Sequence, residues 1–187
     1  MNGYQRSSKM VSPNHSVVLL IDLQNRLLNV MAHKEEVLSN SLKLIEIAKI
    51  MGVPIVASEQ NPERLGPTNQ EVIKALNGTE PIGKVHFSCF GSDELRNALE
   101  KTGRKQVITA GVETHVCVSQ TVVDGQGDYD FFVVADAVSS RTDENRQIGL
   151  ERCREAGALV GSTEMFLYEL LEKAGTEEFR AALKYLK

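Results

Sequence analysis

The sequence predicts an α/β protein, arranged as a three-layer α/β/α sandwich around a mostly parallel sheet. Short apolar runs rich in valine, isoleucine and leucine recur along the chain, and segments with a helical spacing of apolar residues separate them. Alternation of this kind is typical of parallel strands whose crossover helices cover both faces of the sheet. The runs expected to form strands are residues 16–21, 54–58, 105–110, 131–135 and 158–160.

Helical spacing and capping residues predict the intervening helices. Residues 35–51 repeat apolar side chains every three or four positions, and Gly52 follows as a C-terminal stop. Ser92 is a suitable N-cap for a helix that continues to about residue 102, and another helix is expected at residues 144–156. Two further helices are expected to close the chain. Residues 59–70 contain two prolines and a glycine, which predicts a loop.

Composition limits the classes of protein to which the chain can belong. A length of 187 residues suits one domain, expected over residues 16–187, with residues 1–15 as a mobile N-terminal extension. Hydrophobic residues make up 42% and charged residues 25%, which are ordinary values for a globular protein. The net charge of −4, without any block dense in lysine and arginine, argues against nucleic acid as a partner.

The N-terminal half gives no sign of a membrane or secretory segment. The longest apolar run, residues 17–21, is much shorter than the roughly 20 residues that cross a bilayer, so no membrane partner is expected. Residues 1–16 are polar and lack the apolar stretch of a secretory signal, so the expected location is the cytoplasm.

The chain contains three cysteines, Cys89, Cys117 and Cys153, with no CxxC spacing. An odd number of thiols in a cytoplasmic chain argues against a disulfide framework and against a zinc knuckle. For Cys89 and Cys153 we expect the ordinary role of a small buried hydrophobic residue. Cys117 lies in a different context.

Polar residues lie near the ends of three predicted strands, where ligands of parallel sheets bind, and for one of them, Asp136, we expect a structural role. Asp22 comes directly after the first strand, and Cys117 follows Gly111 at the start of a predicted helix. A helix N-terminus or a nearby cation lowers a thiol pKa from about 8.5 to roughly 3.5–7.5. Lys84 would supply the cation if the fold brings it close, and Asp22 would exchange protons with the thiol. Taken alone, Asp22 fits a turn cap, and Lys84 fits a solvated surface amine.

Four blocks of sequence resemble the isochorismatase-like cysteine hydrolases, and they occur in the family order. The match is closest to the isochorismatase domain-containing proteins of unsettled substrate, and a loop block, SEQNPERLG at 58–66, extends it over nearly the whole chain after residue 15. The four blocks are VVLLIDLQN at 17–25, GKVHFSCF at 83–90, AGVETHVCVSQT at 110–121 and VVADAVSSR at 133–141.

The resemblance implies an isochorismatase-like fold and a catalytic triad of Asp22, Lys84 and Cys117. It also implies a non-proline cis peptide between Val112 and Glu113, with the backbone amides of Glu113 and Cys117 forming an oxyanion hole. Gln24 and Phe90 resemble pocket-lining positions and are candidate substrate contacts. Members of the family often self-associate, which implies a homo-oligomer.

One departure from related enzymes concerns metal binding. Nicotinamidases of this family bind a metal through an Asp-x-His pair and a further histidine after the second strand. This chain has Glu59, Gln60 and Asn61 there, and it has no histidine between His33 and His86. We therefore expect neither a metal nor another cofactor.

The leading hypothesis is a cysteine-dependent hydrolase of a small amide or related carbonyl compound that acts through a covalent thioester. The alternative is a binding or thiol-based regulatory module that retains the fold without turnover. An NAD-dependent oxidoreductase fits the α/β pattern less well, because no GxGxxG motif follows a strand.

Overall fold

The central sheet of the computed structural model, which describes residues 6–186, has the strand order β3-β2-β1-β4-β5-β6, and every neighbouring pair is parallel. The chain starts in the middle, adds β2 and β3 on one side, and returns to add β4, β5 and β6 on the other. The direction of winding therefore reverses between β1 and β4, where α/β proteins bind ligands. The strands are β1 (Ser16–Ile21), β2 (Ile55–Gln60), β3 (Ile82–Lys84), β4 (Gln106–Val112), β5 (Asp130–Ser139) and β6 (Leu159–Gly161).

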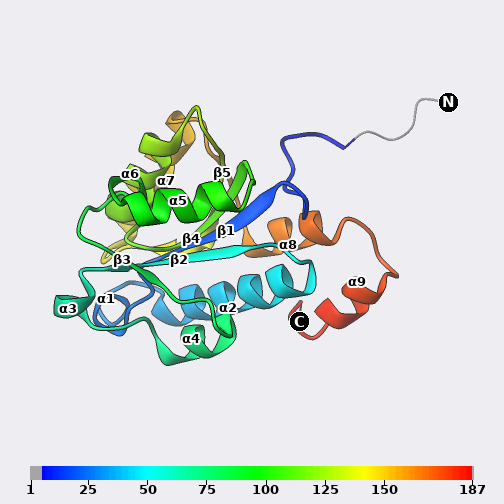
Figure 1. The fold of residues 1–187 in the computed structure, drawn as a ribbon, viewed down its shortest axis with the longest axis horizontal. Helices are drawn as coiled ribbons and strands as arrows, with labels where there is room; N and C mark the ends of the chain where they lie inside the picture. Colours follow the sequence, from blue (N-terminus) through cyan, green and yellow to red (C-terminus); the bar gives the residue numbers. More distant parts are fainter. Residues whose placement is uncertain (1–5, 187) are drawn as a thin grey trace.

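Helices cover both faces of the sheet, as predicted. Figure 1 shows α5, α6 and α7 on one face, with α2, α8 and α9 on the other. None of the helices within residues 6–186 is long and apolar enough to cross a membrane. The helices are α1 (Asn25–Leu28), α2 (Lys34–Ile50), α3 (Pro62–Leu65), α4 (Gln70–Leu76), α5 (Asp93–Lys101), α6 (Ser119–Gly125), α7 (Asp143–Glu155), α8 (Thr163–Leu171) and α9 (Glu177–Ala182). A 3-10 turn, η1 (Cys89–Gly91), and a π-helical turn, η2 (Thr114–Val118), complete the elements.

Four short elements, α1, α3, α4 and β3, were missing from the sequence-based prediction. The segment expected as a loop at 59–70 contains the end of β2 and the short helix α3, and α4 follows it. Strand β3 is only three residues long and contains Gly83, so it has no run of apolar residues that would identify it. Strand β5 runs longer than predicted, with a register shift opposite Thr109 and Gly111.

The N-terminal segment differs from the expected mobile extension. Residues 1–5 lie outside the described residues, whereas residues 6–15 contact the domain. The Val11 side chain is completely buried, and its backbone N–H donates to Glu169 Oε2 over 2.8 Å. Gln106 Nε2 donates to the carbonyl oxygens of Ser8 and Met10. The segment from residue 6 onward therefore belongs to the packed structure.

The core is divided by the sheet into two apolar clusters. Phe131 belongs to the cluster beneath α5, α6 and α7, whereas Phe132 belongs to the cluster against α2 and α8. Adjacent residues of a strand point to opposite faces, which explains the continuous apolar runs in the sequence. Strands buried on both faces leave the carboxyl ends of β1 to β4 as the edge where polar groups gather.

Candidate active site

Asp22 lies directly after β1 and is completely buried. Its backbone has a φ of 55°, a left-handed conformation that is uncommon for a residue other than glycine and marks a sharp turn at the strand end. Ser58 Oγ donates to its Oδ1 over 2.7 Å, and Lys84 Nζ donates to its Oδ2 over 2.7 Å. Both carboxylate oxygens are thus held by neighbouring strands.

Lys84 is the last residue of β3 and pairs in register with Gln60, the last residue of β2. Its Nζ donates to Gln60 Oε1 over 2.6 Å as well as to Asp22. Burial is the largest single effect and opposes the charge of the ammonium group, but Asp22, together with the charges of Cys117 and Cys89, outweighs it and holds the pKa of Lys84 above its ordinary value. The side chains form a buried ion pair in which the lysine stays protonated.

Cys117 lies in the turn η2, which follows β4 and leads into α6. The residue is 5% exposed, and its thiol lies near enough to Asp22 and Lys84 for both of their charges to act on its pKa. Thr121 Oγ1 donates to the Cys117 carbonyl over 2.7 Å, which ties the turn to α6. The structure therefore brings together the three residues proposed as a triad, although they are far apart in the sequence.

The prediction of a lowered thiol pKa is wrong for this arrangement. Burial, followed by the negative charge of Asp22, raises the pKa of the Cys117 thiol to about 12, and the Lys84 charge opposes this only in part. The thiol is consequently protonated at neutral pH and lies under the influence of the Asp22 carboxylate.

The backbone between β4 and η2 adopts the expected arrangement around Glu113. The peptide bond between Val112 and Glu113 is cis. Arg141 Nε donates to Glu113 Oε2 over 3.0 Å, so this side chain is held by the segment after β5. Gly111 has a φ of 121°, and a Cβ at this position would lie 2.0 Å from the carbonyl oxygen of Ile21. Only glycine allows β4 to approach the end of β1 so closely.

Gln24 is not available as a substrate contact, which corrects that expectation. The residue is completely buried, and its amide is occupied by the backbone. Its Nε2 donates to the carbonyl oxygens of Gln60 at 3.0 Å and Gly66 at 2.6 Å, while its Oε1 accepts from the Gln60 N–H at 2.8 Å. Gln24 therefore fixes the end of β2 against the segment after β1.

Phe90, a candidate substrate contact, is partly buried and packs against other aromatic rings. Its ring lies 5.7 Å from that of Tyr129 and 6.3 Å from that of Phe131, measured between centroids. A Cβ on Gly125 would clash with the Phe90 ring, so the ring also covers the end of α6. These contacts make Phe90 part of the aromatic packing in the core cluster on that face of the sheet.

Three polar residues near the triad were not singled out from the sequence: Ser58, Gln60 and Thr121. Ser58 and Gln60 alternate at the carboxyl end of β2, and this spacing of polar residues in a buried strand was the available signal. Cys89 also lies close, because its Sγ is 3.8 Å from Ser58 Oγ and its N–H donates to Thr121 Oγ1 over 2.9 Å. Complete burial raises the pKa of the Cys89 thiol to about 11, consistent with the expected buried role.

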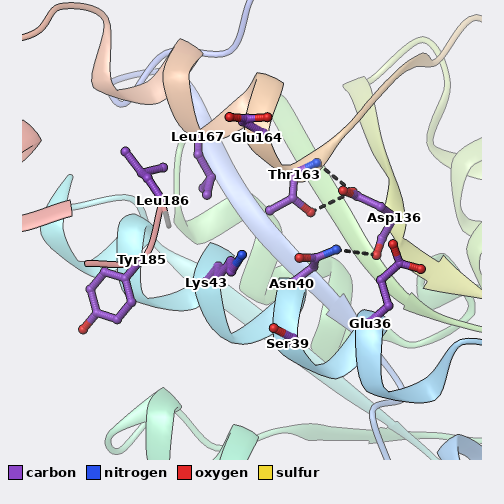
Figure 2. A pocket seen from close by; sticks show the side chains of 10 residues that line it. All are labelled: Glu36, Ser39, Asn40, Lys43, Asp136, Thr163, Glu164, Leu167, Tyr185 and Leu186. Atoms are coloured by element: carbon purple, nitrogen blue, oxygen red, sulfur yellow. Dashed lines mark hydrogen bonds between the residues drawn. The ribbon is translucent and has the colours of Figure 1, made fainter. Parts of the chain in front are cut away.

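A separate cavity lies on the α2 and α8 side of the sheet and contains none of the triad residues. Figure 2 shows that Asp136 lies in its wall, where Asn40 and Thr163 hydrogen-bond to it. The Thr163 N–H and Oγ1 each donate to Asp136 Oδ1 over 2.7 Å, so this aspartate anchors the start of α8. Within residues 6–186, no group of three His, Cys, Asp or Glu side chains is arranged to hold a metal ion.

The sequence matches the isochorismatase domain family over residues 16–165. It is 35% identical over 181 residues to the secreted isochorismatase effector Isc1 of Phytophthora sojae, covering 94% of this chain and 86% of that protein. The fold is similar to that of the MAR1 ribonuclease from Caenorhabditis elegans, with a TM-score of 0.88, 30% identity and coverage of 95% and 92% of the two chains.

A second solved structure is equally similar in fold. The YcaC gene product from Escherichia coli, described as an octameric hydrolase of unknown specificity, has a TM-score of 0.88 and 25% identity, with 97% of this chain and 91% of that chain covered. Together, the family match and the relative at 35% identity assign the sequence. The chain belongs to the isochorismatase family, whose members are generally hydrolases.

Proposed function

We propose that the protein is a cysteine-dependent hydrolase of a small amide or related carbonyl compound. The observation that supports this proposal is the buried Asp22 carboxylate, which accepts a hydrogen bond from the Lys84 ammonium and whose charge acts on the Cys117 thiol. A nucleophile beside a base that is held in place is the arrangement that acyl transfer requires.

In the first step, Asp22 accepts the thiol proton while Cys117 Sγ attacks the carbonyl carbon of the substrate. The raised pKa of the thiol is consistent with this order, because the proton leaves only as the new S–C bond forms. Lys84 keeps the negative charge on Asp22 in place before the transfer and stabilises the sulfur charge that develops during it.

The attack converts the substrate oxygen into an oxyanion, and in the second step this oxygen reforms the carbonyl while the leaving group is expelled. The backbone N–H groups of Glu113 and Cys117 are the proposed donors to that oxygen. Protonated Asp22 returns its proton to the leaving amine, so one C–N bond breaks and a Cys117 thioester remains. Water then attacks the thioester, Asp22 accepts a proton from it, and the acid and the free thiol are released.

The test is a turnover screen of small amides and esters, combined with intact-protein mass spectrometry. For a substrate that is turned over, we expect an acyl mass increase on the wild-type protein in a rapid quench. The Cys117→Ser variant should lose at least about 10³-fold in kcat/KM, in line with the loss of a catalytic nucleophile. Cys153→Ser is the matched control, because this thiol is also buried but does not contact the triad.

Retention of activity in Cys117→Ser would overturn the proposal. An absence of multiple turnover across the screen, with binding of a small molecule still measurable, would favour the alternative of a binding or regulatory module. RNA belongs in the screen because one structural neighbour is named as a ribonuclease. The net charge of −4 argues against RNA as the substrate.

Self-association in the cytoplasm is the remaining part of the proposal. The octameric YcaC neighbour supports a homo-oligomer, which light scattering on the purified protein would measure. The cysteines of the described residues are free, as expected in a reducing compartment. Since one relative is named as secreted, fractionation of expressing cells is the appropriate test of location.

A further inference from the structure

We propose that Gln60 is a positioning residue that fixes the Lys84 ammonium between the Asp22 carboxylate and the Cys117 thiol. The geometry that points to it is the short contact from Lys84 Nζ to Gln60 Oε1, which is 2.6 Å long and buried. This inference rests on the proposed function, since it assigns a role within the same site.

The sheet itself aims the two side chains at each other. Gln60 and Lys84 are Cα partners at the ends of β2 and β3, and partners on adjacent strands point to the same face. The backbone also joins the two strand ends, because the Asn61 N–H donates to the Lys84 carbonyl over 2.7 Å. Both the main chain and the ammonium group of Lys84 are thus held by hydrogen bonds.

The orientation of the Gln60 amide is fixed by its other contacts. Its Nε2 donates to the Val85 carbonyl over 2.9 Å, which leaves Oε1 directed at Lys84. The Gln60 backbone is held in turn by the Gln24 amide, which bonds to both its N–H and its carbonyl. An amide that has one allowed orientation presents a fixed acceptor to the lysine.

The neutrality of Gln60 is part of the argument. Lys84 has three N–H bonds, one of which goes to Asp22 and one to Gln60. An amide oxygen satisfies the second bond without adding a negative charge, so the full positive charge of Lys84 remains available to the Cys117 sulfur, with which it interacts. A carboxylate at this position would neutralise the lysine and oppose formation of the thiolate.

The experiment measures the rate at which iodoacetamide alkylates Cys117 between pH 7 and pH 9.5, by intact-protein mass spectrometry. It uses the full chain in a Cys89→Ala, Cys153→Ala background, so that one thiol reports. We expect Gln60→Met to slow alkylation at pH 8 by at least about threefold, since the lysine loses its fixed place. Gln60→Glu should slow it by at least about tenfold, the effect of raising the thiol pKa by one unit.

Gln106→Met is the matched control. Gln106 is also a buried glutamine that bonds to the backbone through its amide, but it lies at the opposite end of the sheet. Both methionine variants should lose stability, and a less stable protein exposes its thiol more often and is alkylated faster. If alkylation is slower in Gln60→Met but not in Gln106→Met, the slower rate therefore cannot result from destabilisation.

The outcomes separate this inference from the proposed function. Equal alkylation rates in Gln60→Met, Gln60→Glu and the unsubstituted background would overturn the positioning role, even if amides are turned over. Slower alkylation in both variants supports it, even if the turnover screen finds no substrate. A faster rate in Gln60→Met, matching that of Gln106→Met, would mean that Gln60 serves only stability and would overturn the inference as well.

Discussion

The Lys84 ammonium donates to Asp22 Oδ2 over 2.7 Å, and neither side chain has any exposed surface. Removing one partner of such a buried pair leaves an uncompensated charge, which costs about 3–5 kcal/mol in folding stability. Replacing both partners removes that penalty. A double-mutant cycle on Asp22 and Lys84 therefore measures the interaction energy of the pair.

Asp22→Asn should lower the free energy of unfolding by about 3–5 kcal/mol, because Lys84 then remains buried with only amide acceptors. Lys84→Met combined with Asp22→Asn should be more stable than the sum of the two single changes predicts. Urea unfolding of the wild type, the two single variants Asp22→Asn and Lys84→Met, and the double variant measures this coupling. Arg141→Gln is the control, because its pair with Glu113 is exposed on the arginine side and contributes less than about 1 kcal/mol. Additive losses would contradict the buried pair.

Cys153 makes a separate prediction about pH. Burial, opposed by the nearby charges of Arg152 and Arg154, raises the pKa of its thiol from 9.0 to about 11. Between these values the folded chain binds more protons than the unfolded chain, so stability falls as the pH rises. The stabilisation is fully present below pH 9 and is lost as the pH approaches 11.

The test for Cys153 compares the wild type with Cys153→Ala, which lacks this titration. The difference in unfolding free energy between the two proteins should decrease steadily when urea unfolding is repeated from pH 8 to pH 10.5 under reducing conditions. Groups common to both proteins cancel in the difference. A constant or growing difference over this range would contradict the raised pKa.

Gly111→Ala should destabilise the protein by at least about 3 kcal/mol, since the residue combines a left-handed φ with a backbone clash. The new Cβ would lie 2.0 Å from the Ile21 carbonyl oxygen, and neither strand can move without disturbing Asp22. Gly103→Ala is the matched control, because its φ is 66° but no atom lies within 4 Å of the added Cβ. It should cost only about 1–2 kcal/mol. Thermal unfolding of both variants distinguishes a clash from conformational strain alone.

The sequence was sufficient to predict β1 and β4, the strands that lead to Asp22 and Cys117, but not β3, which carries Lys84. The run before Asp22 gave β1 with the bounds that the structure shows, because a strand buried on both faces leaves a continuous apolar signal. The partners of the triad gave no comparable signal. Ser58 and Gln60 matter only because β2 lies between β1 and β3 in a particular register, and registers between strands joined by long crossovers are not local properties.

Burial explains the two expectations that were wrong about chemistry. The direction of the Cys117 pKa depends on how deeply the thiol lies and on which charge is nearest, and neither follows from its place at a helix start. Gln24 follows the same logic, since a polar residue after a buried strand can face a ligand or the backbone of the next strand. The sequence around Gln24 is the same for either orientation, so it cannot distinguish a ligand contact from a backbone contact.

Phe90→Leu tests whether the Phe90 ring serves core packing or contacts the substrate. Because the ring contacts Tyr129 and Phe131, its loss should lower stability by about 1 kcal/mol, the usual cost of changing shape in a packed cluster. The rate of Cys117 alkylation at pH 8 should stay within about twofold of the wild-type rate, since none of these contacts reaches the triad. For any substrate found in the screen, KM should also be unchanged. A large rise in KM without loss of stability would restore Phe90 as a substrate contact.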